Sequence, residues 1–326
     1  MATAAQIKTL LKSHIDRDDS RFYSTALQMA AKEARAGHNK LAQDIKLLVE
    51  QSQRRNELNV VPKTTQLSRV SNEKLGLLLQ ISHPSIRSSE LVLDSGTSGQ
   101  LDKIIFEQRQ KDKLSHFGLK PRRKILFTGA PGTGKTMSAS MLASELKLPL
   151  YTIVLENLIT RYMGETAAKL RLVFDHIAQT KAVYLFDEFD AIGAQRNAAN
   201  DVGEIRRVLN SFLIFVEQDE SESLILAATN HPEMLDKALH RRFDDIIPFN
   251  KPDKAQIKRI ILNRLSAFNM EDLDWDIIAE QAFGLSAAEV TQSSEDAAKE
   301  AVLHHETELT TEMILNAVKR RKLSSS

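Results

Sequence analysis

Residues 124–136 read KILFTGAPGTGKT. The run KILFT has the short apolar pattern of a buried strand, and GAPGTGKT at 129–136 fits G-x-x-x-x-G-K-[ST] at every required position. A helical pattern follows over 135–146. Glycines let successive N–H groups turn toward phosphate oxygens, and the helix N-terminus adds positive potential. A chance Gly-rich turn would lack the strand and the helix on the correct sides, so this order predicts a phosphate-binding loop.

Two positions of this loop have individual expected roles toward ATP and Mg²⁺. Lys135 is expected to reach the β- and γ-phosphates, and the Thr136 hydroxyl to ligate Mg²⁺. The full predicted set for the nucleotide is Gly129, Ala130, Pro131, Gly132, Thr133, Gly134, Lys135, Thr136 and Asp187.

Two further apolar runs end in polar residues. AVYLFDEFD, at 182–190, places Asp187 and Glu188 directly after a strand. Ligands bind outside the carboxyl ends of parallel strands, so we expect Asp187 to lie beside Mg²⁺. Glu188 is expected to orient and deprotonate the attacking water. If this motif stood alone, the alternative would be that the two acids only cap a turn at the end of the strand. SLILAAT ends before Asn230, an amide that can position the same water.

The bulk composition excludes several protein classes. The chain has 326 residues, a formal net charge of +1 and no cysteine, so disulfides and thiolate metal sites are absent. No apolar run approaches the roughly 18 residues of a membrane span, and the N-terminus lacks the pattern of a signal peptide. We therefore expect a cytoplasmic protein with no membrane partner.

Short strand patterns alternate with helices from residue 124 to 249, which predicts a parallel five-stranded α/β sheet of the P-loop NTPase class with flanking helices. The predicted domains are an N-terminal helical bundle at 1–54, a linker at 55–89 that holds a helical run at 75–81, a large α/β subdomain at 90–250, and a small all-helical lid at 251–326.

The order of these motifs resembles the AAA family of ATPases, which are hexameric protein-remodelling motors. The likeness covers about residues 90–320: Walker A at 129–136, Walker B at 183–188, and a sensor asparagine at Asn230. The run Gly284–Val290 is similar to one in the family's helical lid. The resemblance implies an ATP- and Mg²⁺-dependent ATPase that forms a homo-oligomer, expected to be a hexamer when ATP is bound.

The resemblance also assigns residues that act between subunits. The stretch 236–244 is similar to the family's arginine region, in a compact R-R-F form without a glycine spacer. By that likeness Arg241 and Arg242 reach the γ-phosphate of the neighbouring subunit, a role suited to a permanently charged guanidinium. Tyr162, Met163 and Gly164 match the pore loop that grips a polypeptide. A core-packing Tyr-Met pair is the alternative.

Residues 13–38 resemble the N-termini of short bacterial AAA ATPases encoded beside subtilisin-like serine proteases. That likeness implies a protease partner in plasmid maintenance or phage defence. The chain has no G-x-S-x-G elbow, so any proteolysis would belong to the partner.

Three functions remain open. The first is a ring ATPase that remodels or translocates a protein. The second is an ATP-dependent regulatory switch, and the third is a nucleic-acid-linked motor. The basic runs at 120–124 and 319–322 lack interleaved aromatics, which disfavours nucleic acid as a partner.

Overall fold

The computed structural model describes residues 30, 43, 75–158, 163–192, 202–234, 241–266, 268–270, 272–304 and 309–325. The chain divides into two compact units, Met1–Ser68 and Arg69–Ser326. The predicted N-terminal bundle at 1–54 lies outside the described residues except for Ala30 and Gln43, so the account below concerns the second unit.

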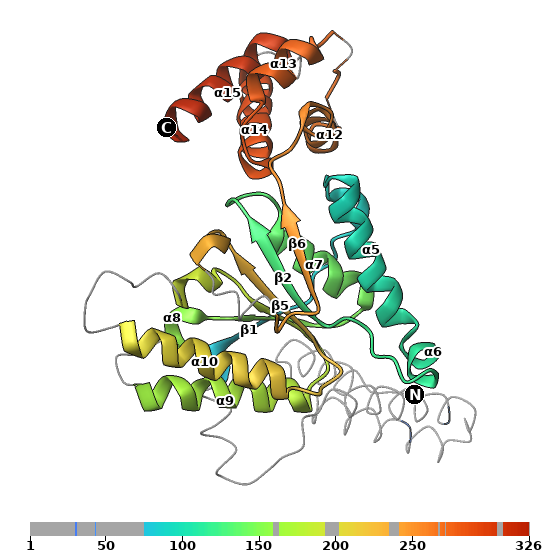
Figure 1. Cartoon of the computed structure of the whole chain (residues 1–326). Helices are drawn as coiled ribbons and strands as arrows, with labels where there is room; N and C mark the ends of the chain where they lie inside the picture. The colour runs from blue at the N-terminus through green and yellow to red at the C-terminus, as the bar shows by residue number, and fades with distance from the viewer. Residues whose placement is uncertain are drawn as a thin grey trace. The chain divides into compact units, whose positions relative to one another are not determined.

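Its centre is a six-stranded sheet with the order β1-β3-β4-β5-β2-β6 (Figure 1). The strands are β1 (Leu79–Ser82), β2 (Lys124–Gly129), β3 (Leu150–Ile153), β4 (Val183–Phe186), β5 (Leu224–Thr229) and β6 (Asp245–Phe249). Strands β2 to β6 are parallel, and each of the five corresponds to a run read from the sequence.

The expectation of five strands was wrong, because β1 adds a sixth. It pairs antiparallel with β3, with Leu79 opposite Ile153 and Ser82 opposite Leu150. In sequence, 75–81 had the spacing of one helical run, but only 75–78 are helical. The strand has four residues, of which only Leu79 is buried. Such a short segment is selected by its pairing with β3 rather than by an alternation of its own.

Helices cover both faces of the sheet. One face carries α5 (Ser95–Arg109) and α7 (Lys135–Leu146), and short α6 (Lys111–His116) follows α5 (Figure 1). The other face carries α8 (Leu155–Leu158), α9 (Met163–Gln179) and α10 (Val202–Gln218). Alternate residues of β2 serve the two cores: Ile125 and Phe127 pack toward α7, and Leu126 packs toward α10.

The chain after β6 forms α12 (Lys254–Arg264), α13 (Trp275–Ala282), α14 (Ala287–His304) and α15 (Thr311–Ser325). These helices have their own apolar core, which includes Ile257, Ile278 and Ile314. Asp253 begins α12 with a capping box, in which its carboxylate accepts from the N–H of Gln256. We call α12 to α15 the C-terminal helical unit. Its place after β6 sets it against the carboxyl ends of the strands (Figure 1).

Candidate nucleotide site

The loop between β2 and α7 is shaped to receive an anion. Gly134 occupies the N-cap of α7 at φ 104°, and no side chain caps that helix. The first N–H groups of α7 are therefore left for a ligand, as phosphate binding requires. Gly129 starts the loop where a Cβ would lie 2.1 Å from the carbonyl oxygen of Phe249, so only glycine fits beside β6.

Lys135 lies almost fully buried under this loop, with 6% exposure. Its ammonium donates to the carbonyls of Gly129 (2.7 Å) and Ala130 (2.9 Å) and to Oδ1 of Asn230 (2.8 Å). Burial lowers the pKa of Lys135 below its ordinary value, and the carboxylates of Asp187 and Asp190 offset part of that shift. An anionic phosphate at the loop would stabilise the charged ammonium further.

The end of β4 brings two carboxylates to the same place. The Thr136 hydroxyl donates to Oδ2 of Asp187 at 2.7 Å, so a hydroxyl and a carboxylate oxygen stand side by side, as Mg²⁺ bound to a nucleotide prefers. The N–H of Glu188 donates to Oδ1 of Asp187 at 2.9 Å. Glu188 itself is exposed and has φ 49°. A left-handed glutamate is uncommon, and such conformations concentrate at functional sites.

Asn230 closes the polar cluster from β5. Its side-chain oxygen accepts from Lys135, and its N–H donates to Asp190 at 3.1 Å. Three strand ends thus supply the residues that the sequence placed in one site, and Lys135, Asp187, Glu188 and Asn230 all line one pocket.

The C-terminal helical unit forms the opposite wall of this pocket. The N–H of Ala288 donates to the carbonyl of Gly132 at 3.0 Å. Gly132 has φ 73°, and a Cβ there would lie 2.7 Å from Oγ of Ser286. Ser286 in turn forms a capping box with Glu289, whose Oε2 accepts from the Ser286 N–H at 2.7 Å. The loop and the helical unit are therefore in direct contact at Gly132.

The pocket has a volume of about 1120 Å³, and part of its wall was missed by sequence analysis. The segment 89–93 lines it, although no motif in the sequence marks these residues. Asp94, which caps α5 by accepting from the Thr97 N–H at 2.8 Å, was a readable helix-start signal. Arg264 and Glu295 also line the pocket and form an ion pair at 2.6 Å, which joins helices too distant in sequence to be paired in advance.

Comparison with known proteins identifies the family. Residues 125–251 match the family described as "ATPase family associated with various cellular activities (AAA)". An uncharacterized AAA family ATPase of Sinorhizobium fredii, y4kL, is 34% identical over 261 residues, which cover 80% of this chain and 78% of that protein. The chain belongs to the AAA family of ATPases. This AAA protein therefore binds and hydrolyses ATP.

Other relatives place the same domain in larger proteins. A putative 26S proteasome regulatory subunit homolog of Methanothermobacter thermautotrophicus is 32% identical, with 56% of its length covered. An ATP-dependent zinc metalloprotease FtsH of Lancefieldella parvula is 32% identical, with 35% covered, so this chain spans only about a third to just over half of these relatives. The crystal structure of the FIGL-1 AAA domain has the same fold, with a TM-score of 0.62 at 22% identity, covering 76% of this chain and 88% of that one.

The two arginines of this AAA chain do not line its own pocket. Arg241 is exposed, and within the described part of the chain it has no ion-pair partner. Arg242 forms an ion pair with Glu217 at the end of α10. Of the predicted pore-loop residues, Tyr162 lies outside the described residues, and the backbone of Met163 and Gly164 begins α9.

The described residues set limits on other sites. They contain no cluster of three or more His, Cys, Asp or Glu side chains placed to hold a metal ion. None of the helices in the described ranges is both long and apolar enough to cross a bilayer.

Proposed function

We propose that this AAA ATPase works in a homo-oligomeric ring, expected to be a hexamer with ATP bound, and uses hydrolysis to remodel or translocate a protein. The observation that carries the proposal is a nucleotide pocket that holds the loop, the acids and Asn230 but not the arginines of the same chain. A site of this kind is completed by a neighbour, since phosphoryl transfer is strongly accelerated by an arginine.

In the proposed site, ATP lies between the loop 129–136 and the C-terminal helical unit. The free N–H groups of α7 and the Lys135 ammonium bind the phosphates, and the adenine lies near 91–93 and 284–288. Mg²⁺ would be held by Thr136 and, through water, by Asp187, where it would neutralise charge on the phosphate oxygens. Glu188 accepts the proton of the attacking water, and Asn230 orients that water. Arg241 and Arg242 come from the neighbouring subunit.

The contact at Gly132 supports coupling of nucleotide state to movement. The Ala288 N–H bond to the Gly132 carbonyl joins the helical unit to the loop that holds the phosphates. A change in phosphate occupancy at that loop therefore acts directly on the helical unit. In the proposal this motion carries the Tyr162 loop, which grips the substrate chain.

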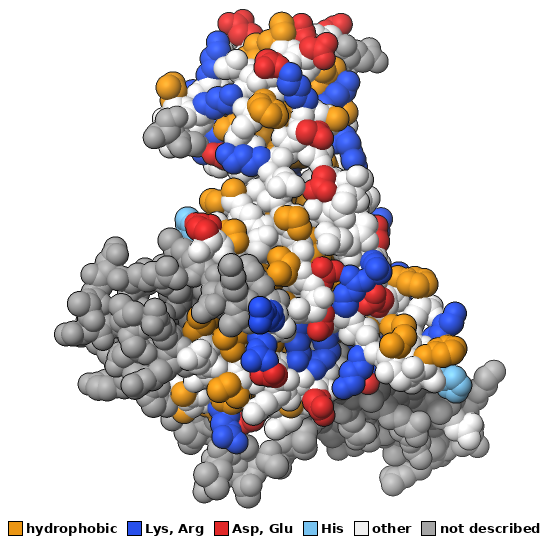
Figure 2. Space-filling model, viewed as in Figure 1, with side chains coloured by type: hydrophobic (Ala, Val, Ile, Leu, Met, Phe, Trp, Pro, Cys, Tyr) orange, Lys and Arg blue, Asp and Glu red, His pale blue; other side chains and the backbone are white. Residues whose placement is uncertain are grey.

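A protein substrate is favoured over nucleic acid by charge. Figure 2 shows Lys and Arg side chains intermingled with Asp and Glu on the displayed face, in keeping with the net charge of +1. Nucleic-acid binding instead needs a basic surface. Relatives named as metalloproteases and as a proteasome regulatory subunit homolog point the same way. The N-terminal resemblance adds a subtilisin-like protease, in plasmid maintenance or phage defence, as the proposed partner.

Subunit mixing tests the shared site. Arg241→Gln and Glu188→Gln are each expected to abolish hydrolysis alone. Mixed, they should regain activity, because an intact Arg241 from the second variant meets an intact Glu188 in the first. Size-exclusion with light scattering, with and without ATP, checks that both variants assemble. Mixed assemblies that stay inactive would rule out a site shared between subunits.

The kind of substrate needs a separate assay. ATP turnover is compared with an unfolded protein, with DNA, or with neither, and stimulation by the unfolded protein alone is expected. Tyr162→Ala should keep basal turnover and lose that stimulation. Stimulation by DNA alone would point to a nucleic-acid motor, and no stimulation to a switch whose hydrolysis only resets a partner.

A further inference from the structure

The two neighbouring arginines have different surroundings in the same chain. The Arg242 side chain is 38% exposed and pairs with the Glu217 carboxylate, which is 53% exposed. Arg241 is exposed and has no such partner among the described residues. Both had been assigned the same role from sequence, so the difference calls for an explanation in structure.

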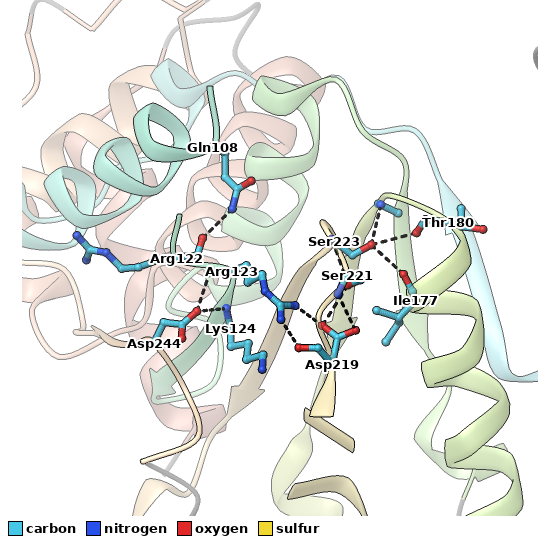
Figure 3. Close-up of polar contacts among 11 residues, drawn as sticks. Gln108, Arg122, Arg123, Lys124, Ile177, Thr180, Asp219, Ser221, Ser223 and Asp244 are labelled. Atoms are coloured by element: carbon cyan, nitrogen blue, oxygen red, sulfur yellow. Dashed lines mark hydrogen bonds and ion pairs between the residues drawn. The ribbon is translucent and has the colours of Figure 1, made fainter. Parts of the chain in front are cut away.

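The backbone that follows Arg242 is firmly held. Phe243 is buried against the core beneath α10, with 7% exposure. The carboxylate of Asp244 accepts from the N–H groups of Arg123 and Lys124, both at 2.9 Å (Figure 3). The Asp244 N–H donates back to the Lys124 carbonyl at 2.7 Å. These bonds fasten the arginine segment to the first residues of β2.

The end of α10 that carries Glu217 is fastened to the same place. The Arg123 guanidinium binds both the carboxylate and the main-chain oxygen of Asp219, whose side chain is 3% exposed. Ser221 donates its hydroxyl to the same carboxylate at 3.1 Å (Figure 3). Glu217 lies two residues before Asp219. The backbone near Arg242 and the backbone near Glu217 are therefore both bonded to Arg123, one through its N–H and the other through its guanidinium. This fixes the two side chains opposite each other.

We propose a division of labour between the arginines: Arg241 is the residue that reaches the neighbour's phosphate, and Arg242 is a positioning residue held by Glu217 of its own chain. This inference rests on the proposed function, in which the arginine region acts in trans. Because Arg242 is turned toward α10, its ion pair sets the orientation of the backbone from which Arg241 projects. Glu217 becomes a positioning residue of the ATPase site, although it touches no nucleotide.

A charge swap separates the two roles. Arg242→Glu sets two carboxylates against each other and is expected to lower kcat at least tenfold. Glu217→Arg with Arg242→Glu rebuilds the pair in reverse and should restore kcat to within about threefold of the wild type, because ion-pair geometry, not a cation at 242, is what Arg241 needs. Arg241→Gln should lose on the order of 10³-fold, the scale of an arginine finger.

The control uses an exposed acid at the same helix end. Glu220→Arg has no ion pair to break among the described residues, and combined with Arg242→Glu it should rescue nothing. Thermal melting and light scattering are measured on every variant. A half-exposed ion pair adds little to stability, so the melting temperatures should stay together while kcat separates.

Two results would contradict these proposals, and they can be told apart. If the reversed pair assembles but stays as inactive as Arg242→Glu, then Arg242 itself contacts phosphate and the division of labour is wrong, while the shared site stands. If Arg241→Gln keeps wild-type kcat, the arginine region does not act on ATP, and the proposed function fails with it.

Discussion

The backbone N–H groups near the two ends of strand β2 differ in their hydrogen-bond partners. At the carboxyl end, Gly134 begins α7 without a side-chain cap, so the first N–H groups of that helix have no side-chain acceptor. At the amino end, the Asp244 carboxylate takes up the N–H groups of both Arg123 and Lys124. One end is prepared for a ligand and the other is completed by the chain itself. A single strand of six residues thus joins a binding site to a structural anchor.

This contrast predicts that substitutions at the carboxyl end act on nucleotide binding and turnover directly. Those at the amino end lower the stability of the fold and reach the ATPase site only through the arginine region. Among substitutions at the two ends of β2, the largest effect is expected for Lys135→Met. It removes the buried cation that the proposed site sets against the phosphates, and loss of one preorganised charge of this kind costs about 10²–10³-fold in kcat. Phosphate release and nucleotide titration measure it. Lys181→Met, on the exposed amino side of β4, is the matched control and should leave both unchanged.

Arg123→Met should give the largest loss of stability. It leaves the carboxylate of Asp219 buried without its guanidinium, a situation that costs about 3–5 kcal/mol. Urea unfolding measures the change. Arg109→Met, which breaks a pair with Glu145 that is 54% and 30% exposed, should cost about 1 kcal/mol or less. Equal losses in the two variants would contradict the picture of a structural anchor at Arg123.

Gly132→Ala tests the contact between loop and helical unit. The residue has φ 73°, and the new Cβ would meet Oγ of Ser286 at 2.7 Å and Cβ of Ala288 at 3.0 Å. The strain of a left-handed alanine, about 1–2 kcal/mol, and its contacts with Ser286 and Ala288 favour a displaced loop in the empty protein. Nucleotide binding must then restore the loop, so affinity should fall about tenfold. A fluorescent nucleotide reports the dissociation constant.

Gly99→Ala is the control for that substitution. Gly99 lies within α5, and nothing stands within 4 Å of its added Cβ. Alanine there should leave affinity unchanged and raise the free energy of unfolding by up to about 1 kcal/mol. Wild-type affinity in Gly132→Ala would show that the contact yields freely.

The smallest effect belongs to the surface of the amino end. Hydrogen bonds from Lys111 and Lys181 lower the pKa of Glu222 from 4.5 to about 2. A carboxyl whose pKa is lower in the folded state stabilises that state above its unfolded pKa, and the gain is lost as pH falls through the window between the two values.

Glu222→Gln should therefore lower the free energy of unfolding at pH 6 by less than about 1 kcal/mol, which appears as a slightly lower melting temperature. The difference should shrink as the pH approaches 3 and in 1 M salt, because exposed charges are screened. A difference that is independent of both would assign the effect to packing.

Sequence reasoning placed elements correctly in the fold where a local pattern determines the backbone conformation. The loop 129–136, the strand end at Asp187 and Glu188, and the five parallel strands were readable because glycine geometry and apolar runs are local properties. It failed at β1, whose four residues are a strand only because β3 is beside them. The contribution of residues 89–93 to the pocket wall was also missed, because a local sequence pattern does not indicate which cavity a loop lines.

The amino-acid order alone placed a glycine-rich loop between a strand and a helix, an acidic pair after a buried strand and an arginine pair further on, and it predicted phosphate binding at the loop. Tertiary structure decided what lies next to what. It set the Ala288 N–H on the Gly132 carbonyl, and it turned Arg242 toward Glu217 while leaving Arg241 exposed. The sequence does not distinguish the two adjacent arginines. They differ in the folded chain because, among the described residues, packing places a carboxylate beside only one of them, Arg242.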